Sequence, residues 1–468
     1  MIFSSVYFLS IFLPFFLITF YLARIELRKW VIVIFSLIFY AWGAPNFIYF
    51  LLASSVIDFF LSNKFTSKNK KYFLWVSLTL NIGLLAYFKY ANFFVANTSS
   101  IADAFGYRLI SIKEVLLPIG ISFFTFQKIS YAIDVYSGKN ERLTNFLDYL
   151  LYIIMFPQLI AGPIVRYKDV SEQIKNYKEN KLPDKLNGLY RFIIGLSKKV
   201  LIANTFAAIV SQTSAINLHL LSTSDAWIGI LAYTFQIYFD FSGYSDMAIG
   251  LGLMIGFKFP ENFNFPYLSK SITEFWQRWH ITLGTWMRDY LYIPLGGNKV
   301  KTTRLYFNLV FVFFISGFWH GANWNFIIWG LYHGFFLMAE RAFLNKILNV
   351  LPNFIQIIYT FFIVVIGWVF FSMELDEAII YISKLFSFSD FNLSIQLSNK
   401  TIFLGFLGII FSFLAINNKI SILLSNFTSI SLNNNKSVYI FPIMISLFIL
   451  SFLSLLTSGF NPFIYYKF

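Results

Sequence analysis

The chain has 468 residues, of which 58% are hydrophobic and 12% are charged. Soluble globular domains carry roughly 25% charged residues, so this composition excludes an ordinary soluble protein and predicts a polytopic membrane protein. The net charge of +14 does not indicate nucleic-acid binding, because the Lys and Arg residues lie in short loops between apolar runs, where they set topology. The chain has no cysteine, which excludes disulfides, thiolate metal sites and an acyl-cysteine intermediate.

Long apolar runs recur along the sequence. The run at 3–22 lacks the basic n-region and cleavage site of a signal peptide, so we interpret it as a retained first span. The further runs are 30–42, 47–61, 72–90, 115–136, 145–160, 192–210, 227–256, 354–371, 402–416 and 438–456. Together with the stretch at 271–334, they predict an all-α polytopic membrane protein with about eleven membrane helices, the shorter ones re-entrant or interfacial.

Polar segments between these runs predict turns, loops and topology. Gly43-Ala-Pro45-Asn46 predicts a tight turn, and residues 91–114 predict a nearly neutral loop. The basic loops at 24–29, 64–71 and 166–185 are expected on the cytoplasmic side, which places the N-terminus outside.

No internal repeat and no soluble catalytic domain is visible in the sequence. We therefore expect one membrane-embedded domain across 1–468, with a motif-bearing core at about 115–345 and peripheral spans at 1–114 and 346–468.

The long run at 227–256 carries two carboxylates and a pair of glycines. We interpret Gly252-x-x-x-Gly256 as a site of close helix–helix packing. Asp240 and Asp246 are either ligands for a proton or substrate, or structural groups that pair with Lys or Arg or cap a helix break at Gly243. We favour the structural interpretation.

Residues 271–334 hold three of the four histidines and six of the eleven tryptophans. Ionisable groups at membrane depth cost several kcal/mol unless they are paired or hydrated, so this stretch is the first functional candidate. Apolar residues recur at helical spacing through 272–290, which predicts one helix. On it, Gln277, His280 and Gly284 would share a face, giving the imidazole a polar neighbour and an open space beside it.

The second histidine, His320, ends the apolar run at 306–319. Ser316 lies one turn before it, and small residues on either side would let a ligand approach the ring. A neutral imidazole in an apolar pocket suits a general base, although a single histidine on an apolar helix is more often a packing residue. Asn323 and His333 are supporting candidates, and His333 can equally be a packing residue.

Other site classes find no support in the sequence. There is no H-E-x-x-H, no P-loop and no G-x-S-x-G, and four scattered histidines without cysteine predict no metal site. A basic patch of Lys299, Lys301 and Arg304 suits phosphate groups, or it is ordinary cytoplasmic-side charge.

Five passages together resemble the membrane-bound O-acyltransferase (MBOAT) family, in its bacterial branch that includes the alginate O-acetylation protein AlgI. They are 156–166 (F-P-Q-L-I-A-G-P-I-V-R), 238–250 (Y-F-D-F-S-G-Y-S-D-M-A-I-G), 262–283 (N-F-N-F-P-Y-L-S-K-S-I-T-E-F-W-Q-R-W-H-I-T-L), 288–298 (R-D-Y-L-Y-I-P-L-G-G-N) and 317–334 (G-F-W-H-G-A-N-W-N-F-I-I-W-G-L-Y-H-G). The resemblance implies a central funnel or tunnel that holds two motif histidines. His320 matches the catalytic histidine of the family, and His280 matches its second characteristic histidine.

The resemblance also implies a reaction. In this branch an acyl group from a cytoplasmic thioester, with acetyl-CoA as the expected donor substrate, crosses the inner membrane to an extracytoplasmic acetyltransferase partner. The partner then esterifies an envelope polysaccharide, here peptidoglycan or an exopolysaccharide, and no bound cofactor is implied. In this scheme His320 is the base, and His280 orients the donor, stabilises the developing charge or acts as a second base. Arg278 and Arg288, together with the basic patch, are candidates to bind the donor phosphates.

Three alternatives remain open from the sequence. The acyl group could be D-alanine, moved from a carrier-protein thioester to teichoic acid. The protein could instead be a polysaccharide transporter or flippase without acyl chemistry, although its charge is concentrated around one histidine-bearing stretch. A covalent acyl intermediate on Ser316 or a nearby hydroxyl is compatible with the sequence, but nothing requires it.

Overall fold

Helices make up the structure, a computed structural model that describes residues 2–65, 67–107, 114–388, 390–414, 436–457, 461–462 and 464. Within these ranges the only strand-like pairing is an isolated β-bridge between Phe263 and Trp279. The predicted all-α class is therefore confirmed for the described residues.

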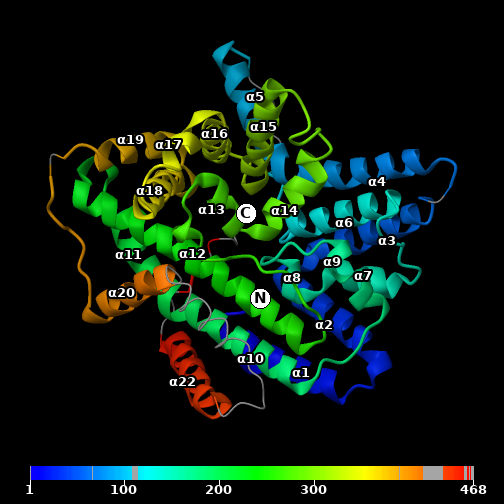
Figure 1. Cartoon of the computed structure of the whole chain (residues 1–468). Coiled ribbons are helices and arrows are strands. Elements are labelled where there is room, and N and C mark those ends of the chain that lie inside the picture. The colour runs from blue at the N-terminus through cyan, green and yellow to red at the C-terminus, as the bar shows by residue number, and fades with distance from the viewer. Residues whose placement is uncertain are drawn as a thin grey trace.

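The first group of helices lies mostly at one side of the molecule, with its last member, α5, at the top of the view (Figure 1). Its members are α1 (Leu13–Leu22), α2 (Arg28–Gly43), α3 (Ile48–Ser62), α4 (Lys70–Leu85), the π-helical η4 (Ala86–Tyr90) and α5 (Ala91–Ala104). The predicted turn between α2 and α3 is confirmed, because α2 ends at Gly43 and a 3₁₀ turn at Pro45–Phe47 leads into α3.

The loop predicted at 91–114 is wrong over its first half, which forms α5. This helix continues α4 and η4 and projects beyond the body of the molecule (Figure 1). Its polar side chains do not compete with the helix, because Asn97, Thr98 and Ser100 donate to carbonyls one turn earlier on the same helix.

The middle of the chain supplies the helices that carry the motifs. They are α6 (Ile121–Tyr136), α7 (Phe146–Ile154), α8 (Phe156–Leu159), α9 (Tyr167–Lys175), α10 (Leu182–Ser197), η5 (Lys198–Ala203), α11 (Asn204–Ser214), α12 (Thr223–Met254), α13 (Ile272–Arg278), α14 (Ile281–Met287), η8 (Arg288–Tyr292), α15 (Thr302–His320) and α16 (Trp324–Ala339). The last part of the chain contributes α17 (Asn345–Leu348), α18 (Asn353–Ser372), α19 (Leu375–Leu385), α20 (Asn399–Phe413) and α22 (Lys436–Thr457). The last two residues of the run predicted at 402–416 lie outside the described residues.

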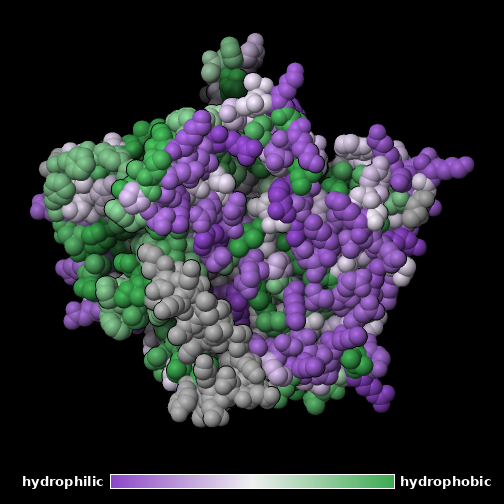
Figure 2. Space-filling view, in the orientation of Figure 1, coloured by the Kyte–Doolittle hydropathy of each residue, from purple (hydrophilic) through white to green (hydrophobic). Residues whose placement is uncertain are grey.

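Among the residues that the structure describes, six helical stretches are long and apolar enough to cross a membrane. They are Pro45–Ser62, Lys70–Ala104, Leu182–Ser214, Thr302–His320, Asn353–Ser372 and Ile440–Thr457, with two shorter apolar helices at Phe8–Leu22 and Asn399–Phe413. The structure thus supports a multi-pass membrane protein, but it does not confirm the predicted count of eleven spans. Hydrophilic residues gather over the centre and right of one face, and hydrophobic residues lie along its left edge (Figure 2).

The long helix α12 crosses the middle of the molecule beside α10 (Figure 1), and glycines bring their backbones together. A Cβ atom on Gly195 would lie 2.5 Å from the carbonyl oxygen of Gly243, and one on Gly188 would lie 2.6 Å from that of Gly250. In each helix the two glycines are seven residues apart, which is two turns, so one face of α10 meets one face of α12 without intervening side chains.

The glycine pair singled out in the sequence is not the one that packs two helices together. Gly256 lies after the end of α12 with φ of +99°, and Gly252 faces the Phe259 ring in the loop that follows. The prediction of helix packing at these two positions is therefore wrong. A G-x-x-x-G spacing marks small residues on one face, but only the tertiary structure decides what approaches that face.

We predict that Gly195→Ala destabilises the protein, because the added methyl group would force α10 and α12 apart. Overpacking of this kind costs about 1–3 kcal/mol, seen as a lower thermal unfolding midpoint in detergent. Gly83→Ala in α4 is the matched control, since no atom lies within 4 Å of its added Cβ, and it should leave the midpoint unchanged or raise it. Equal midpoints for the two variants would contradict this account of the contact.

Candidate active site

The predicted helix across 272–290 is broken at Trp279 and His280. Helix α13 ends at Arg278, α14 begins at Ile281, and His280 adopts a left-handed conformation with φ of 44°. Residues 262–264 run alongside the break and replace its helical hydrogen bonds: Asn264 N donates to Arg278 O (2.9 Å) and Ile281 N donates to Asn262 O (3.0 Å). Long-range pairing has therefore overridden the helical periodicity.

Asn262 fixes the orientation and tautomer of His280. Its Oδ1 accepts from Thr282 Oγ1 (2.8 Å) and from the Thr282 backbone N–H (3.3 Å), and its Nδ2 donates to Ser245 Oγ (3.0 Å). A backbone N–H can only donate, so the atom that also faces His280 Nδ1 at 3.0 Å is an oxygen. Nδ1 must then carry the proton, which leaves the lone pair on Nε2 available to act as a base.

His320 occupies the last position of α15 and is 3% exposed. Its ring packs edge-on against Trp319, Trp329 and Phe371, with centroid distances of 5.0, 5.1 and 5.2 Å. Three large rings thus hold the imidazole at the point where α15 ends.

The indole of Trp319 brings the two histidines into one site. Its centroid lies 6.3 Å from that of His280 and 5.0 Å from that of His320. Trp319 also stacks on Phe126 (5.1 Å), which in turn stacks on Trp286 (3.8 Å). The rings of Trp319, Phe126, Trp286, Trp329 and Phe371, which we call the aromatic frame, thus hold two buried imidazoles that are 40 residues apart in sequence.

The supporting candidates take different places. His333 is fully buried and packs edge-on against Trp276 (5.0 Å) and Trp329 (5.2 Å), so it joins the aromatic frame behind His320. Asn323 caps α16, where its Oδ1 accepts from Trp324 N.

Two further candidates lie close to the histidines in sequence. Ser316 is buried on α15, one turn before His320. Gln277 is exposed on α13, and the polar partner of His280 is Asn262. The predicted role of Gln277 beside His280 is therefore wrong, since the break removes their shared helical face.

The two carboxylates of α12 form ion pairs. Asp246 pairs with Arg191 and Lys198, both at 2.6 Å. Asp240 pairs with Lys199 (2.8 Å) and accepts from Ile464 N (2.8 Å) near the C-terminus. The pairing that we favoured is confirmed, but α12 runs unbroken through Gly243, so neither group caps a helix break.

The cationic candidates do not converge on the histidines as one patch. Arg278, which lies two residues before His280, pairs with Glu274 at 2.7 Å. Lys299, Lys301 and Arg304 are exposed near the start of α15, and Arg304 lies about 24 Å along the helix from its last residue at 1.5 Å per residue.

Arg288 belongs to a separate charged cluster on η8. Asp289 there accepts from Arg288 (2.8 Å), Arg166 (2.8 Å) and Lys168 (2.7 Å). Burial raises the pKa of the Asp289 carboxyl, but hydrogen bonds and charges from Arg288 and Lys168 outweigh it, and the pKa lies below its usual value. This cluster therefore remains charged at neutral pH.

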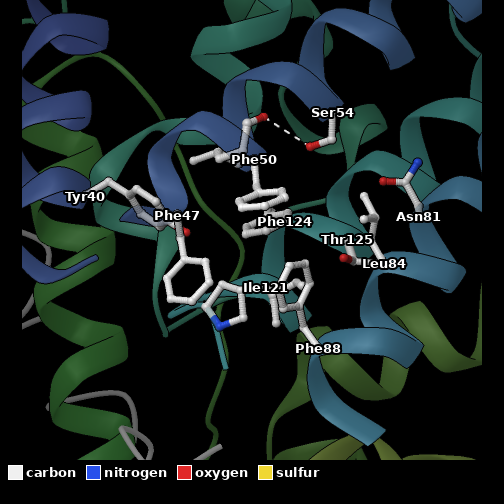
Figure 3. Close-up of a pocket in the computed structure, with 12 residues that line it drawn as sticks. Tyr40, Phe47, Phe50, Ser54, Asn81, Leu84, Phe88, Ile121, Phe124 and Thr125 are labelled. Atoms are coloured by element: carbon white, nitrogen blue, oxygen red, sulfur yellow. Dashed lines mark hydrogen bonds between the residues drawn. The ribbon is translucent and has the colours of Figure 1, made fainter. Parts of the chain in front are cut away.

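A small cavity lies away from the histidines, among α2, α3, α4, η4 and α6 (Figure 3). Aromatic and aliphatic side chains line most of it, and Ser54 there donates to the Leu51 carbonyl at 3.2 Å. Neither His280 nor His320 lines this cavity. It is a mainly apolar gap between the first helices and α6, apart from the two histidines.

Two residues at the site escaped the sequence analysis. Asn262 lies in a quoted passage, but no spacing relates it to His280, 18 residues later. Lys89 donates to the Trp319 carbonyl from η4, 230 residues earlier in the chain. Its signal was a single lysine inside the apolar run at 72–90, which is the kind of intramembrane charge that marks function.

Known proteins resemble this chain over most of its length. The model of the membrane-bound O-acyltransferase family (MBOAT) matches residues 139–376, which include both His280 and His320. A probable alginate O-acetylase AlgI from Azotobacter vinelandii is 44% identical over 400 residues, covering 84% of this chain and 80% of that protein. A peptidoglycan O-acetyltransferase from Helicobacter pylori is 39% identical over 428 residues, covering 82% of this chain and 79% of that protein.

The names of more distant relatives specify the transfer of another acyl group. A teichoic acid D-alanyltransferase from Streptococcus thermophilus is 30% identical over 252 residues, which is 50% of this chain and 59% of that protein. The chain is thus similar to acyltransferases of envelope polymers, and more similar to those whose names specify acetyl transfer.

The ion pair between Asp240 and Lys199 makes a stability prediction. Both side chains are at most 2% exposed, so Asp240→Asn should leave an uncompensated buried cation and cost about 3–5 kcal/mol. We expect a lower thermal unfolding midpoint in detergent, largely restored in the double variant Asp240→Asn/Lys199→Met. Asp376→Asn, which changes an exposed carboxylate, is the control, and a drop of the same size there would refute the role of the pair.

Proposed function

The chain belongs to the membrane-bound O-acyltransferase family, and on that basis we propose that it transfers acetyl groups from a thioester donor for O-acetylation of a cell-envelope polysaccharide. The observation that carries this proposal is the pair of buried histidines on Trp319, one of them held by Asn262 with its Nε2 lone pair available. Acyl transfer to a hydroxyl needs an imidazole base in a site that excludes water.

The proposed reaction uses His320 as the general base. The imidazole takes the proton of the acceptor hydroxyl while the hydroxyl oxygen attacks the thioester carbonyl carbon. The tetrahedral intermediate then collapses, the carbon–sulfur bond breaks, and the proton passes to the departing thiolate. His280 faces the same indole and is assigned to orient the thioester or to act as a second base for the acceptor.

Acetyl-CoA is the donor that we propose, presented from the cytoplasmic side. Arg278 is the cationic candidate nearest to the histidines in sequence, and it stands beside the helix break. Lys299, Lys301 and Arg304 lie near the opposite end of α15, so phosphates bound there would require a donor that extends along that helix. Of the two placements, the first requires the shorter reach.

The acceptor and the setting follow from the relatives. Because their names specify alginate and peptidoglycan, we propose an envelope polysaccharide as the final acceptor and an extracytoplasmic acetyltransferase protein as the partner that delivers the group. The chain would then lie in the bacterial inner membrane with its N-terminus outside. D-alanyl transfer is the second candidate. Its support is weaker, because the teichoic acid D-alanyltransferase is less similar and matches only half of the chain.

The direct test is acyl transfer in proteoliposomes with radiolabelled acetyl-CoA, comparing wild type with His320→Ala. We expect label in a glycan or partner fraction with wild type and a loss on the order of 10²–10⁴-fold without the base. His219→Ala, which removes an exposed histidine in the α11–α12 connection, should behave as wild type. Full activity of His320→Ala would disprove the assignment, and label from a carrier-bound D-alanyl thioester alone would favour the second candidate.

Asn262→Leu tests the control of the His280 tautomer. The substitution removes the acceptor for Nδ1 and leaves the Thr282 N–H without its side-chain partner, so we expect kcat to fall about tenfold or more. The matched control is Ser245→Ala, which removes only the support behind Asn262 and should have a smaller effect. A wild-type kcat in folded Asn262→Leu would show that the tautomer of His280 is not used.

A further inference from the structure

Lys89 is a buried lysine with neutral partners beside the histidine site. It is 8% exposed in η4, and the other two lysines that are buried in the described part of the chain, Lys128 and Lys199, each lie within 3.5 Å of a carboxylate. For Lys89 the described residues offer no ion pair; instead, its Nζ donates to Trp319 O (2.5 Å) and Ser122 Oγ (3.2 Å). An ammonium group is costly to bury without a counter-ion. A lysine at this buried position therefore indicates a functional role.

The partners of Lys89 lie at the end of α15. The carbonyl groups in the last turn of a helix lack intrahelical donors, and the helix dipole makes this end negative. Lys89 satisfies the carbonyl of Trp319, the residue directly before His320, and its Nζ lies 5.6 Å from the centroid of the Trp319 ring. The ammonium group thus touches both the peptide and the indole that hold the two imidazoles.

The neighbouring residue holds the same helix end without a charge. Tyr90 donates to Phe318 O (2.9 Å), and the two rings stack at 4.0 Å. Both Lys89 and Tyr90 lie on η4, and π-helical turns within helices are frequent at functional sites. One turn of a peripheral span therefore clamps two consecutive carbonyls of α15.

We propose that Lys89 is a positioning residue for His320, which fixes the Trp319 peptide and indole so that the imidazole stays aligned with the reacting groups. This inference rests on the proposed function. Ser122 on α6 accepts a second hydrogen bond from Lys89 Nζ. Losing the cation would loosen the last residues of α15, and misplacement by about 1 Å can cost about 10²-fold in rate.

The test compares Lys89→Met with Tyr90→Phe in the acetyl-CoA assay, with wild type and His320→Ala as the limits. We expect Lys89→Met to lower kcat about 10²-fold while KM for acetyl-CoA stays within about twofold, because the donor site is untouched. Tyr90→Phe removes one neutral hydrogen bond at the same helix end and should lower kcat by less than about threefold. Lys89→Arg, which keeps the charge, should recover part of the loss.

Several results would overturn the proposal. One is wild-type kcat in Lys89→Met; another is an equal loss in Tyr90→Phe, which would mean that helix capping alone matters. If Lys89→Met does not fold, Ser122→Ala decides: a lower kcat at unchanged KM supports the role, and an unchanged kcat refutes it. An inactive wild type would overturn the proposed function together with this inference, whereas an active wild type with an equally active Lys89→Met would overturn only the latter.

Discussion

The break between α13 and α14 is the constraint on which the site depends. Backbone groups at a helix break must be hydrogen-bonded inside an apolar interior, because no water is there to replace the lost partners. Residues 262–264 supply those partners, and His280 adopts a left-handed conformation that costs a residue with a side chain roughly 1–2 kcal/mol. The result is an imidazole beside Trp319, whereas an unbroken helix would have placed it on the same face as Gln277, which is exposed.

The same constraint connects the site to the centre of the fold. Asn262 reaches α12 through Ser245, and α12 lies against α10 by direct backbone contact at Gly195 and Gly243. The long, glycine-spaced pair of helices is therefore the base on which the His280 tautomer is set. His320 is held from the opposite direction, by the aromatic frame and by η4.

Much of this could be predicted from the sequence, and what could not has physical reasons. Apolar runs located most of the helices, charge rules anticipated the pairing of Asp240 and Asp246, and the two motif histidines lie beside the same indole, that of Trp319. Periodicity failed where tertiary pairing competes with it, at His280, and local spacing could not reveal partners such as Asn262 and Lys89. Lys89 belongs to a span that we expected to be peripheral. Its position in the sequence does not reveal its contact with Trp319, which lies 230 residues later in the chain.

The most direct measurement is the identity of the acid that mild alkali releases from purified envelope polysaccharide. Cells that express the wild-type chain would be compared with cells that express His320→Ala at the same level. The account predicts ester-linked acetate with wild type and background acetate with the variant. Equal acetate from both, or D-alanine in place of acetate, would contradict the claim that the buried histidine site transfers acetyl groups.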